Sequence, residues 1–389
     1  MSSPPGIERT SAQDSCPGTL QVHQAADGGL ARVRVPAGVL SAVQWKALIG
    51  AAAELGDGNL DLTSRGNVQL RGLRPGAETA LASRLVEAGL LPSLTHERVR
   101  NLLASPLTGL DGDGSADLRS LVGELDRELC ARPELAELSG RFLFAFDDGR
   151  GDIGAMGADV TLTAIDPRTA TLSLAGVPVG VVPLSEAVAA MLASAAAFLR
   201  LRSADGSNAW RIAELADGPG RIAAALPPQH ALLTARPASP SSSPCPIGPI
   251  AQRDGSTALV VGIPLGRLSA VSATALSHHD LVLTPWRSIV VPNLIGADAA
   301  RLRTTAAAAG LIVDGSSPWL GVTACTGRPG CVKALADVRA DAGSALARAR
   351  GASATTHWSG CERRCGTPKG EVIDMLATGS GYLRNGIPV

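Results

Sequence analysis

The sequence predicts an α+β protein that is built from two related halves and carries a metal-binding region near its C-terminus. A short motif occurs twice, as Pro36–Val43 and Pro264–Val271, with the same residue at six of eight positions. Apolar runs of strand period and of helix period alternate irregularly along the chain, which favours α+β over a regularly alternating α/β fold. Four cysteines come as two close pairs, Cys325 with Cys331 and Cys361 with Cys365.

The repeated motif indicates an internal duplication. Each copy leads into a helical run and then into a strand that ends alike, at Leu60–Arg65 and at Leu281–Arg287. On this match, Arg287 takes the position equivalent to Arg65. Two copies packed about a pseudo-two-fold axis create a shared cleft, and such a cleft suits a large ligand.

Other segments are assigned from their periodicity. The first 14 residues are polar and rich in Ser and Pro, so we expect them to be disordered. Gly140–Phe146 places three phenylalanines on one face, as a half-buried strand does. Val160–Ile165 and Thr169–Leu174 predict a hairpin. Ser185 is the expected N-cap of a helix over Glu186–Leu199.

Composition excludes several function classes. The 35 basic and 35 acidic residues cancel, so no global basic field attracts nucleic acid or an anionic membrane. The basic residues are arginines except for Lys46, Lys333 and Lys369. No N-terminal run resembles a signal peptide, and the longest apolar stretch, Ala187–Leu199, is too short to span a bilayer. We therefore expect a cytoplasmic protein that binds neither nucleic acid nor membrane.

The two cysteine pairs predict a soft metal centre. Their spacings, C-x5-C and C-x3-C, favour a [4Fe–4S] cluster over structural zinc, although zinc and four unrelated thiols stay open. A helical pattern over Cys331–Arg350 places Cys331 at a helix N-terminus. A strand over Ala354–Ser359 then returns the chain, so both pairs meet at one end. Cys16, Cys130 and Cys245 are read as inert thiols.

Several segments, taken in order, resemble the siroheme-dependent nitrite and sulfite reductases. They are Asp27–Pro36, Leu62–Arg71, Arg100–Asn101 ahead of Ser105–Pro106, and the cysteine pattern. The resemblance implies duplicated ferredoxin-like half-domains with two sulfite-reductase-like α/β lobes. The expected parts are a disordered N-terminus (1–14), a first half-domain (15–74), a first α/β lobe (75–236), a Pro/Ser linker (237–256), a second half-domain (257–310) and a cluster lobe (311–389).

Within that superfamily the chain looks most like the precorrin-3B synthases of aerobic cobalamin biosynthesis. Asp14–Gly18 and His357–Cys365 carry this likeness. Siroheme reductases use lysines after the Arg-Asn motif to bind and protonate a small oxyanion, but this chain has no lysine between Lys46 and Lys333. Siroheme proteins also usually carry Asn where Arg363 stands. Both departures favour the synthase.

The resemblance implies an oxygen-dependent hydroxylation and γ-lactone formation on the tetrapyrrole precorrin-3A, with dioxygen and an external electron donor. Cys325, Cys331, Cys361 and Cys365 would hold the [4Fe–4S] cluster. A non-haem iron is implied as well, and the sequence does not assign its ligands. The alternatives are a siroheme-dependent nitrite or sulfite reductase, in which Cys365 would also bridge to siroheme, and a non-enzymatic iron–sulfur protein.

Arginines are the expected partners of the ring carboxylates, which match the guanidinium fork. By the resemblance, Arg65 and Arg100 are the first candidates, followed by Arg141 and Arg71. Three polar residues would position the ring edge or satisfy turns and strand ends, namely Thr63, Gln69 and Asn101. Four histidines near these motifs receive no role from the sequence: His96, His278, His279 and His357.

Overall fold

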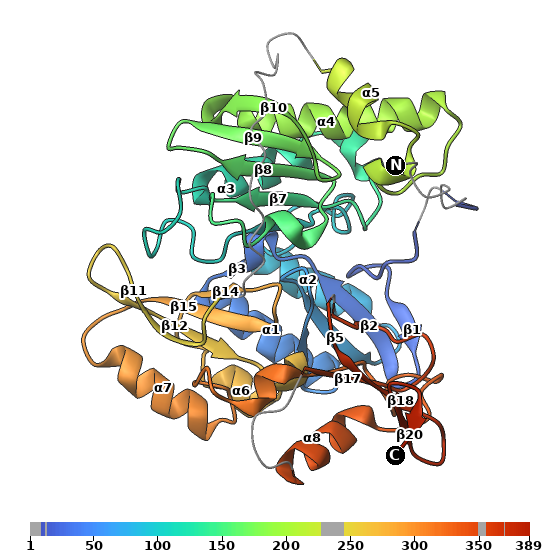
Figure 1. Cartoon of the computed structure of the whole chain (residues 1–389), viewed down its shortest axis with the longest axis vertical. Helices are drawn as coiled ribbons and strands as arrows, with labels where there is room; N and C mark the ends of the chain where they lie inside the picture. Colours follow the sequence, from blue (N-terminus) through green and yellow to red (C-terminus); the bar gives the residue numbers. More distant parts are fainter. Residues whose placement is uncertain (1–8, 12–13, 227–244, 349–354, 369) are drawn as a thin grey trace.

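The computed structural model describes residues 9–11, 14–226, 245–348, 355–368 and 370–389. In this part of the chain the strands form four five-stranded sheets, and helices cover them. The α+β prediction is confirmed. Figure 1 shows the two half-domains at the centre and a smaller lobe that holds the C-terminus below them. An α/β lobe lies above them, and we call it the middle lobe because it lies between the two half-domains in the sequence.

The first half-domain is built on sheet A. Its strand order is β1 (His23–Ala25), β2 (Gly28–Val33), β5 (Val68–Leu73), β4 (Leu60–Leu62) and β13 (Arg267–Leu268). Helices α1 (Ala42–Leu55) and α2 (Ala77–Glu87) belong to it. Ser41 begins α1 with a reciprocal capping box with Gln44, which satisfies backbone donors of the first turn.

The second half-domain is built on sheet B. Its strand order is β11 (Gly248–Ala251), β12 (Thr257–Gly262), β15 (Ser288–Leu294), β14 (Leu281–Leu283) and β3 (Val39–Leu40). Its helices are α6 (Ala270–Thr274) and α7 (Asp298–Ala308). Ser269 caps α6 as Ser41 caps α1.

The two half-domains exchange strands. Strand β3 of the first copy pairs with β14 of the second, and β13 of the second copy pairs with β4 of the first. Ala37 and Leu265, at the same place in the repeated motif, share a rare left-handed backbone with φ of 51° and 53°. The duplication read from the sequence is therefore present in three dimensions, as a pseudo-two-fold pair.

One hydrophobic core joins both copies, and two domain boundaries differ from those expected from the sequence. This core contains Leu81 and Leu85 of α2 and extends to Leu91, so the first half-domain ends after residue 91 rather than at 74. In the second copy, β11 begins at residue 248, inside the expected linker of 237–256. Of that linker, residues 237–244 lie outside the described residues.

The middle lobe, residues 102–226, is an α/β unit. Sheet C has the order β10 (Val177–Pro183), β9 (Thr169–Leu174), β8 (Val160–Ala164), β7 (Phe144–Asp147) and β6 (Leu102–Ala104). Its helices are α3 (Arg119–Cys130), α4 (Leu184–Ala204) and α5 (Gly218–Ala224). The β8–β9 hairpin is confirmed. The phenylalanine strand is buried on both faces rather than one, because Ala145 packs in a separate small core opposite Phe144 and Phe146.

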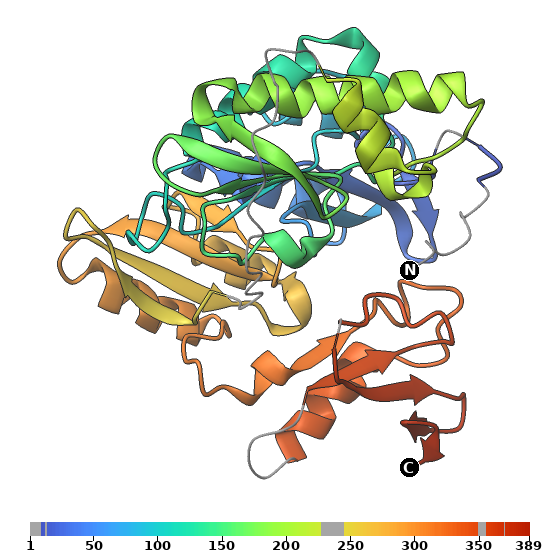
Figure 2. The ribbon, with the colours of Figure 1, turned by 45° about the horizontal axis from the view of Figure 1, so that its top comes forward.

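Helix α4 is longer than expected. It begins at Leu184, with Pro183 rather than Ser185 at the N-cap position, and runs for 21 residues. By length and composition it could cross a membrane, but 56% of its most apolar window is buried inside the protein. It packs along sheet C as a core helix, and Figure 2 shows it lying across that lobe.

The C-terminal lobe, residues 318–389, holds the four clustered cysteines. Sheet D has the order β16 (Val322–Ala324), β17 (Thr356–Ser359), β18 (Ile373–Ala377), β19 (Tyr382–Arg384) and β20 (Ile387–Pro388). Its helix α8 spans Val338–Arg348. The expected helix start at Cys331 is wrong, because Asp337 accepts a hydrogen bond from the backbone of Ala340 and so caps a helix that begins seven residues later.

Part of the N-terminal segment is ordered. Arg9 pairs with Glu214 and stacks on Trp210, with its guanidinium carbon 4.1 Å from the ring centroid. Asp14 is buried and accepts hydrogen bonds from the Ser139 hydroxyl and the Gly140 backbone. The expectation of disorder over residues 1–14 is wrong for these positions, since the middle lobe supplies partners for them. Residues 1–8, 12 and 13 lie outside the described residues.

Candidate functional site

Sheet A has one apolar and one polar face, and the polar face forms the floor of the site. In β2, Ala31 and Val33 lie in the core, so the alternate residues Arg32 and Arg34 point to the opposite face. The cross-strand neighbours of Arg32 continue this polar row: Gln69, Asp61 and Arg267. The face contacts the middle lobe at one end and the C-terminal lobe at the other.

Four arginines gather where this face meets the middle lobe. This arginine cluster consists of Arg32, Arg34, Arg65 and Arg141. The four lie close enough to repel one another: in addition to burial, the charge of Arg141 lowers the pKa of Arg32, and the charges of Arg32 and Arg65 lower the pKa of Arg34. Within the described ranges, none of the four forms a salt bridge with a carboxylate. The cluster therefore carries an excess of positive charge that an anionic ligand would neutralise.

Arg34 is the most informative member of the cluster. It is 2% exposed, and its Nε donates to the Arg98 carbonyl at 3.1 Å. Its Nη1 and Nη2 are buried without any hydrogen-bond partner. Burial, and next the charge of Arg32, lower the pKa of Arg34 to about 9. A buried cation with two free donors is unfavourable unless it serves a ligand.

Arg65 and Arg141 lie in the cluster, as the sequence led us to expect. The Nη1 of Arg65 donates to the Gly140 carbonyl at 3.4 Å. Burial, followed by the charge of Arg211, lowers the pKa of Arg65 to about 10. Arg141 is exposed, with its guanidinium carbon 5.4 Å from the centre of the Trp210 ring. Their role as carboxylate ligands stays a prediction.

Arg100 and Arg71 have other partners. Arg100 is 4% exposed and forms a two-pronged ion pair with Asp126, with both nitrogen–oxygen distances at 2.7 Å, and also donates to the Leu90 carbonyl. Arg71 pairs with Asp27 and donates to the Gly330 carbonyl. The charge of each is therefore matched inside the protein, and a role of either as a carboxylate ligand stays a prediction.

The three predicted polar residues support the cluster rather than line it. The Gln69 amide, oriented with its oxygen toward Arg32, accepts from Nη2 at 2.6 Å and from Nε at 3.1 Å of that guanidinium. The Thr63 hydroxyl accepts two backbone hydrogen bonds within its own turn. Asn101 donates to the carbonyls of Arg98 and Gly140. Gln69 orients Arg32, and Asn101 fixes the Gly140 loop beside Arg65.

Sequence reasoning missed Arg32, Arg34 and Cys16. The signal for the two arginines was present, because an alternating apolar–arginine run in a strand places both arginines on one face. Cys16, expected to be an inert thiol, lies close enough to Arg32 and Arg34 to interact with both electrostatically. Its backbone N–H donates to Asp14 at 2.7 Å. No sequence pattern links Cys16 to residues of β2.

The four clustered cysteines converge at one end of sheet D. Strands β16 and β17 are parallel, so Cys325 and Cys361 follow strands that end at the same edge. The Gly360 backbone N–H donates to the sulfur of Cys325 at 3.2 Å. Burial, then the nearby thiols of Cys325, Cys361 and Cys331, raise the pKa of Cys365. The expected convergence of both pairs is thus present in the structure.

The spacing of these thiols indicates which centre they could hold. One tetrahedral zinc ion with bonds of about 2.3 Å would bring sulfurs within about 3.8 Å of each other. No three of the four sulfurs, all of them in described residues, lie within 4.8 Å of one another. The donor set therefore fits a larger thiolate-bound centre better than a single zinc ion. Gly360 supplies an N–H to a ligand sulfur, as outer contacts of such centres do.

The repeat match of Arg287 is corrected by one residue. Thr63 and Asn67 close one turn by a backbone hydrogen bond, and Thr284 and Ser288 close the other in the same way. Counting from these turns, Arg287 is equivalent to Gly66, which shares its positive φ. The counterpart of Arg65 is therefore Trp286.

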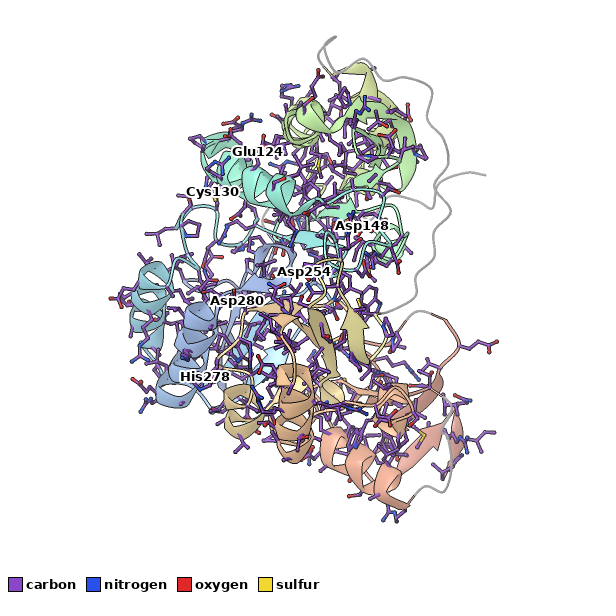
Figure 3. The ribbon with its side chains drawn as sticks, turned by 90° about the vertical axis from the view of Figure 1, so that its left-hand side faces the viewer. Glu124, Cys130, Asp148, Asp254, His278 and Asp280 are labelled. Carbon is purple, nitrogen blue, oxygen red and sulfur yellow. The ribbon has the colours of Figure 1, made fainter. Side chains whose placement is uncertain are left out.

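The histidines remain outside the arginine cluster. His96 is buried and bonded to Ser93, Thr95 and the Arg132 carbonyl, which explains it as a packed residue. His357 is fully buried, with Nδ1 bonded to the Thr323 hydroxyl at 2.9 Å. In Figure 3, His278 lies beside the helices of the half-domains, below the middle lobe, and Cys130 lies on α3.

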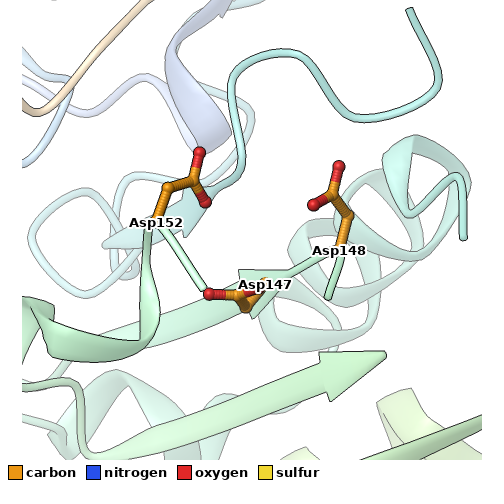
Figure 4. A group of neighbouring side chains, drawn as sticks. All are labelled: Asp147, Asp148 and Asp152. Carbon is orange, nitrogen blue, oxygen red and sulfur yellow. The ribbon is translucent and has the colours of Figure 1, made fainter. Parts of the chain in front are cut away.

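A group of three buried aspartates does not have the free ligand atoms of a metal site. Asp147, Asp148 and Asp152 lie together after β7 (Figure 4). The Asp147 carboxylate accepts four backbone N–H groups of its loop, and both oxygens of Asp148 accept from Arg150. Burial raises the pKa of Asp152 to about 6. The group organises a loop between the middle lobe and the second half-domain.

A groove of about 630 Å³ between α7 and sheet B lies away from both candidate centres. Alanine and threonine side chains form much of its lining, with Arg303 as the one charged residue. A ligand site needs several convergent polar groups, so this groove does not compete with the arginine cluster.

Comparisons with known proteins agree with this architecture. Residues 23–88 match the nitrite/sulfite reductase ferredoxin-like half domain. A precorrin-3B synthase of Sinorhizobium sp. is 27% identical over 98% of this chain and 86% of its own length. These two matches support the nitrite and sulfite reductase superfamily as the one that this chain resembles.

Two further proteins match this chain, one in part of its sequence and one in its fold. A ferredoxin–nitrite reductase of Synechococcus elongatus is 35% identical, but over only 31% of this chain and 25% of its own length. The solved structure of the NirA protein of Mycobacterium tuberculosis matches with a TM-score of 0.71 and 22% identity, over 92% of this chain and 73% of that one. The fold of that protein is thus shared by nearly the whole chain.

Proposed function

We propose that this protein is a precorrin-3B synthase, which converts precorrin-3A by oxygen-dependent hydroxylation and γ-lactone formation in cobalamin biosynthesis. The observation that carries the proposal is the arginine cluster, whose four guanidinium groups form no salt bridge among the described residues, while the nearby Asp14 and Asp159 pair with Arg98 and Arg211. The synthase of Sinorhizobium sp. aligns along nearly the whole chain, whereas the nitrite reductases align over a third of it or less.

A polycarboxylate ring suits this cluster better than a small oxyanion does. Several carboxylates around one ring can each take a separate arginine, and the two free nitrogens of Arg34 offer one such site. Reduction of an oxyanion needs proton donors, and a guanidinium keeps its proton. The chain has no lysine between Lys46 and Lys333, and Arg141 is the cationic group beside Arg32 and Trp210.

The proposed role of the arginines is orientation. Arg34, held from one side by the Arg98 carbonyl, and Arg32, held by Gln69, have fixed directions before a ligand binds. A ring held by such pre-set groups presents one edge and one carboxylate side chain in a defined position, which favours lactone closure over other outcomes. The cluster residues thus bind and place the ring rather than move protons.

We further propose that Cys325, Cys331, Cys361 and Cys365 hold a [4Fe–4S] cluster in a cytoplasmic enzyme. Such a cluster supplies single electrons, which an external donor would replenish and which dioxygen chemistry at a non-haem iron requires. Two observations support this centre: no three of these four described sulfurs lie within 4.8 Å of one another, and the Gly360 N–H contacts the Cys325 sulfur. The described residues do not suggest ligands for the second iron.

The deciding experiment is anaerobic purification followed by an absorption spectrum and a turnover assay. A broad sulfur-to-iron shoulder without a Soret-like band, together with conversion of precorrin-3A only when oxygen and a reductant are present, is the expected result. For the variants Arg34→Met and Arg65→Met described below, Arg301→Met is the control, because Arg301 is an exposed residue of α7.

The second candidate is a siroheme-dependent nitrite or sulfite reductase, which the partial matches to ferredoxin–nitrite reductases favour. An intense Soret-like band, with siroheme extractable into acid acetone, would establish that candidate and exclude the synthase. An iron–sulfur protein without enzymatic function predicts a different outcome again. In that case Arg34→Met and Arg65→Met would leave the affinity for a polycarboxylate tetrapyrrole unchanged.

A further inference from the structure

Two arginines join the polar face of sheet A to the loop that carries the first cysteine pair. Arg71 lies on β5 of the first half-domain, and Arg339 lies on α8 of the C-terminal lobe. Each one bonds a carboxylate of the first half-domain and a backbone carbonyl of the cysteine loop. Arg71 reaches the loop from the first half-domain, and Arg339 reaches it from within the C-terminal lobe.

Arg71 holds the second cysteine of the pair. Its side chain is 5% exposed, and its Nε and Nη2 pair with Asp27 at 2.8 and 2.9 Å. The same Nη2 donates to the carbonyl of Gly330, the residue before Cys331, at 2.7 Å. A buried guanidinium that satisfies a carboxylate and a carbonyl at once fixes the distance between them.

Arg339 holds the first cysteine. Its Nη1 bonds the Asp61 carboxylate at 3.0 Å, and its Nε donates to the carbonyl of Cys325 at 3.4 Å. Asp61 is 5% exposed and lies on β4, four residues before Arg65 of the arginine cluster. Asp61 also faces Arg267, which pairs in turn with Asp57, so the charges of these two arginines and two aspartates balance.

Gly330 leaves no space between the loop and sheet A. A Cβ at this position would lie 2.9 Å from Arg71 Nη2 and 2.9 Å from Asp27 Oδ2. It would also lie 2.7 Å from the Thr326 side chain of the same loop. The close approach of the loop to the Arg71–Asp27 pair therefore depends on glycine.

We propose that Arg71 and Arg339 are positioning residues that seat the Cys325–Cys331 loop on the ring-binding half-domain and raise the reduction potential of its metal centre. This rests on the proposed function, which supplies that centre. A reduced centre carries one more negative charge, and each arginine compensates a carboxylate beside the loop, Asp27 or Asp61, that would otherwise disfavour the reduced form. The seat also sets the distance from the centre to the arginine cluster.

The test separates the effect of the positive charge from the effect of the hydrogen-bond geometry that seats the loop. Arg71→Met and Arg339→Met remove both, Arg71→Lys and Arg339→Lys keep the charge without the two-pronged geometry, and Gly330→Ala keeps both charges while displacing the loop. Arg348→Met is the control, since Arg348 is an exposed residue of the same helix α8. The readouts are the midpoint potential from a redox titration, the EPR line shape of the reduced protein, and the rate of absorbance loss to an iron chelator.

The methionine variants are expected to show a more negative potential and about tenfold faster loss of iron, as for other outer contacts of metal ligands. The lysine and Gly330→Ala variants should keep a potential near that of the unsubstituted protein but lose iron faster. Wild-type values for all three readouts in the methionine variants would overturn the proposal. If the unsubstituted protein itself holds no iron–sulfur centre, the proposed function fails instead, and the spectrum of that protein alone distinguishes the two failures. Should a methionine variant not fold, the lysine and alanine variants decide.

Discussion

Replacing Arg34 by leucine is expected to make the free protein more stable and its ligand binding weaker. Burial and the charge of Arg32 lower the pKa of Arg34 from 12.5 to about 9. That difference corresponds to roughly 4–5 kcal/mol of unfavourable interaction for the charged form. Leucine would remove this term and fill much of the same apolar volume.

The substitution also removes one hydrogen bond, from Arg34 Nε to the Arg98 carbonyl. That bond contributes about 1 kcal/mol, and the carbonyl keeps a second donor in Asn101 Nδ2. The net expectation is a gain of roughly 3 kcal/mol in the free energy of unfolding, within the range seen when unpaired buried charges are replaced by apolar groups.

Urea denaturation at neutral pH measures the first effect, with Arg301→Leu as a surface control that should stay within about 0.5 kcal/mol of the parent protein. Fluorescence titration with uroporphyrin, a stable tetrapyrrole octacarboxylate, measures the second. Loss of a charged hydrogen-bonding pair predicts about 10- to 100-fold weaker binding. A variant that is less stable than the parent and binds uroporphyrin equally well would refute the assignment of Arg34 as a ligand-binding cation.

Three further outcomes follow from the same contacts. Arg65→Met should weaken uroporphyrin binding about tenfold or more and, because burial also lowers the pKa of Arg65 to about 10, should raise the free energy of unfolding by roughly 2 kcal/mol. Arg100→Met should instead lower the free energy of unfolding by about 3 kcal/mol, because Asp126 loses its buried partner. The reverse pattern in the two titrations would contradict the structure. Burial opposes ionisation of Asp14, but hydrogen bonds from Cys16 and Ser139 outweigh it and bring the pKa of Asp14 down to about 2. The contribution of the Asp14 carboxylate to the stability of the fold is therefore fully present above the unfolded pKa near 4, and it is lost as the pH falls through 2. Asp14→Asn should therefore cost about 2 kcal/mol at pH 7 and progressively less below pH 4, and denaturation curves with no pH-dependent difference would count against it. Cys325→Ser should abolish the iron content of the purified protein while Cys130→Ser leaves it intact, and equal iron in both by colorimetric assay would remove Cys325 from the ligand set.

The duplicated fold could be predicted from sequence because its signals are local. The repeated motif around Pro36 and Pro264 carries its own turn, cap and strand, and these recur with the same backbone angles. The strand exchange could not be predicted, since β3 and β13 are two residues long and their partners lie more than 200 positions away. Such short strands have no periodicity of their own.

The site was predictable only in part, for a related reason. A motif identifies an arginine but not its partner, and Arg100 is neutralised by Asp126 from a helix that folds back on it. Arg71 is likewise matched by Asp27 across a turn of sheet A. Arg32 and Arg34 lie inside the Asp27–Pro36 segment that carries the family resemblance, but no ligand role was drawn from that segment. Strand alternation alone places both on the polar face.

The strand exchange between the copies has a consequence for synthesis on the ribosome. Sheet A gains its fifth strand only from residues 267–268, and β3 pairs only with a strand at residues 281–283. The first half-domain therefore leaves the ribosome with one sheet edge uncovered and a strand without a partner. Neither copy is complete until both have been translated, so the middle lobe, whose sheet C comes entirely from residues 102–183, is the part able to close its sheet first.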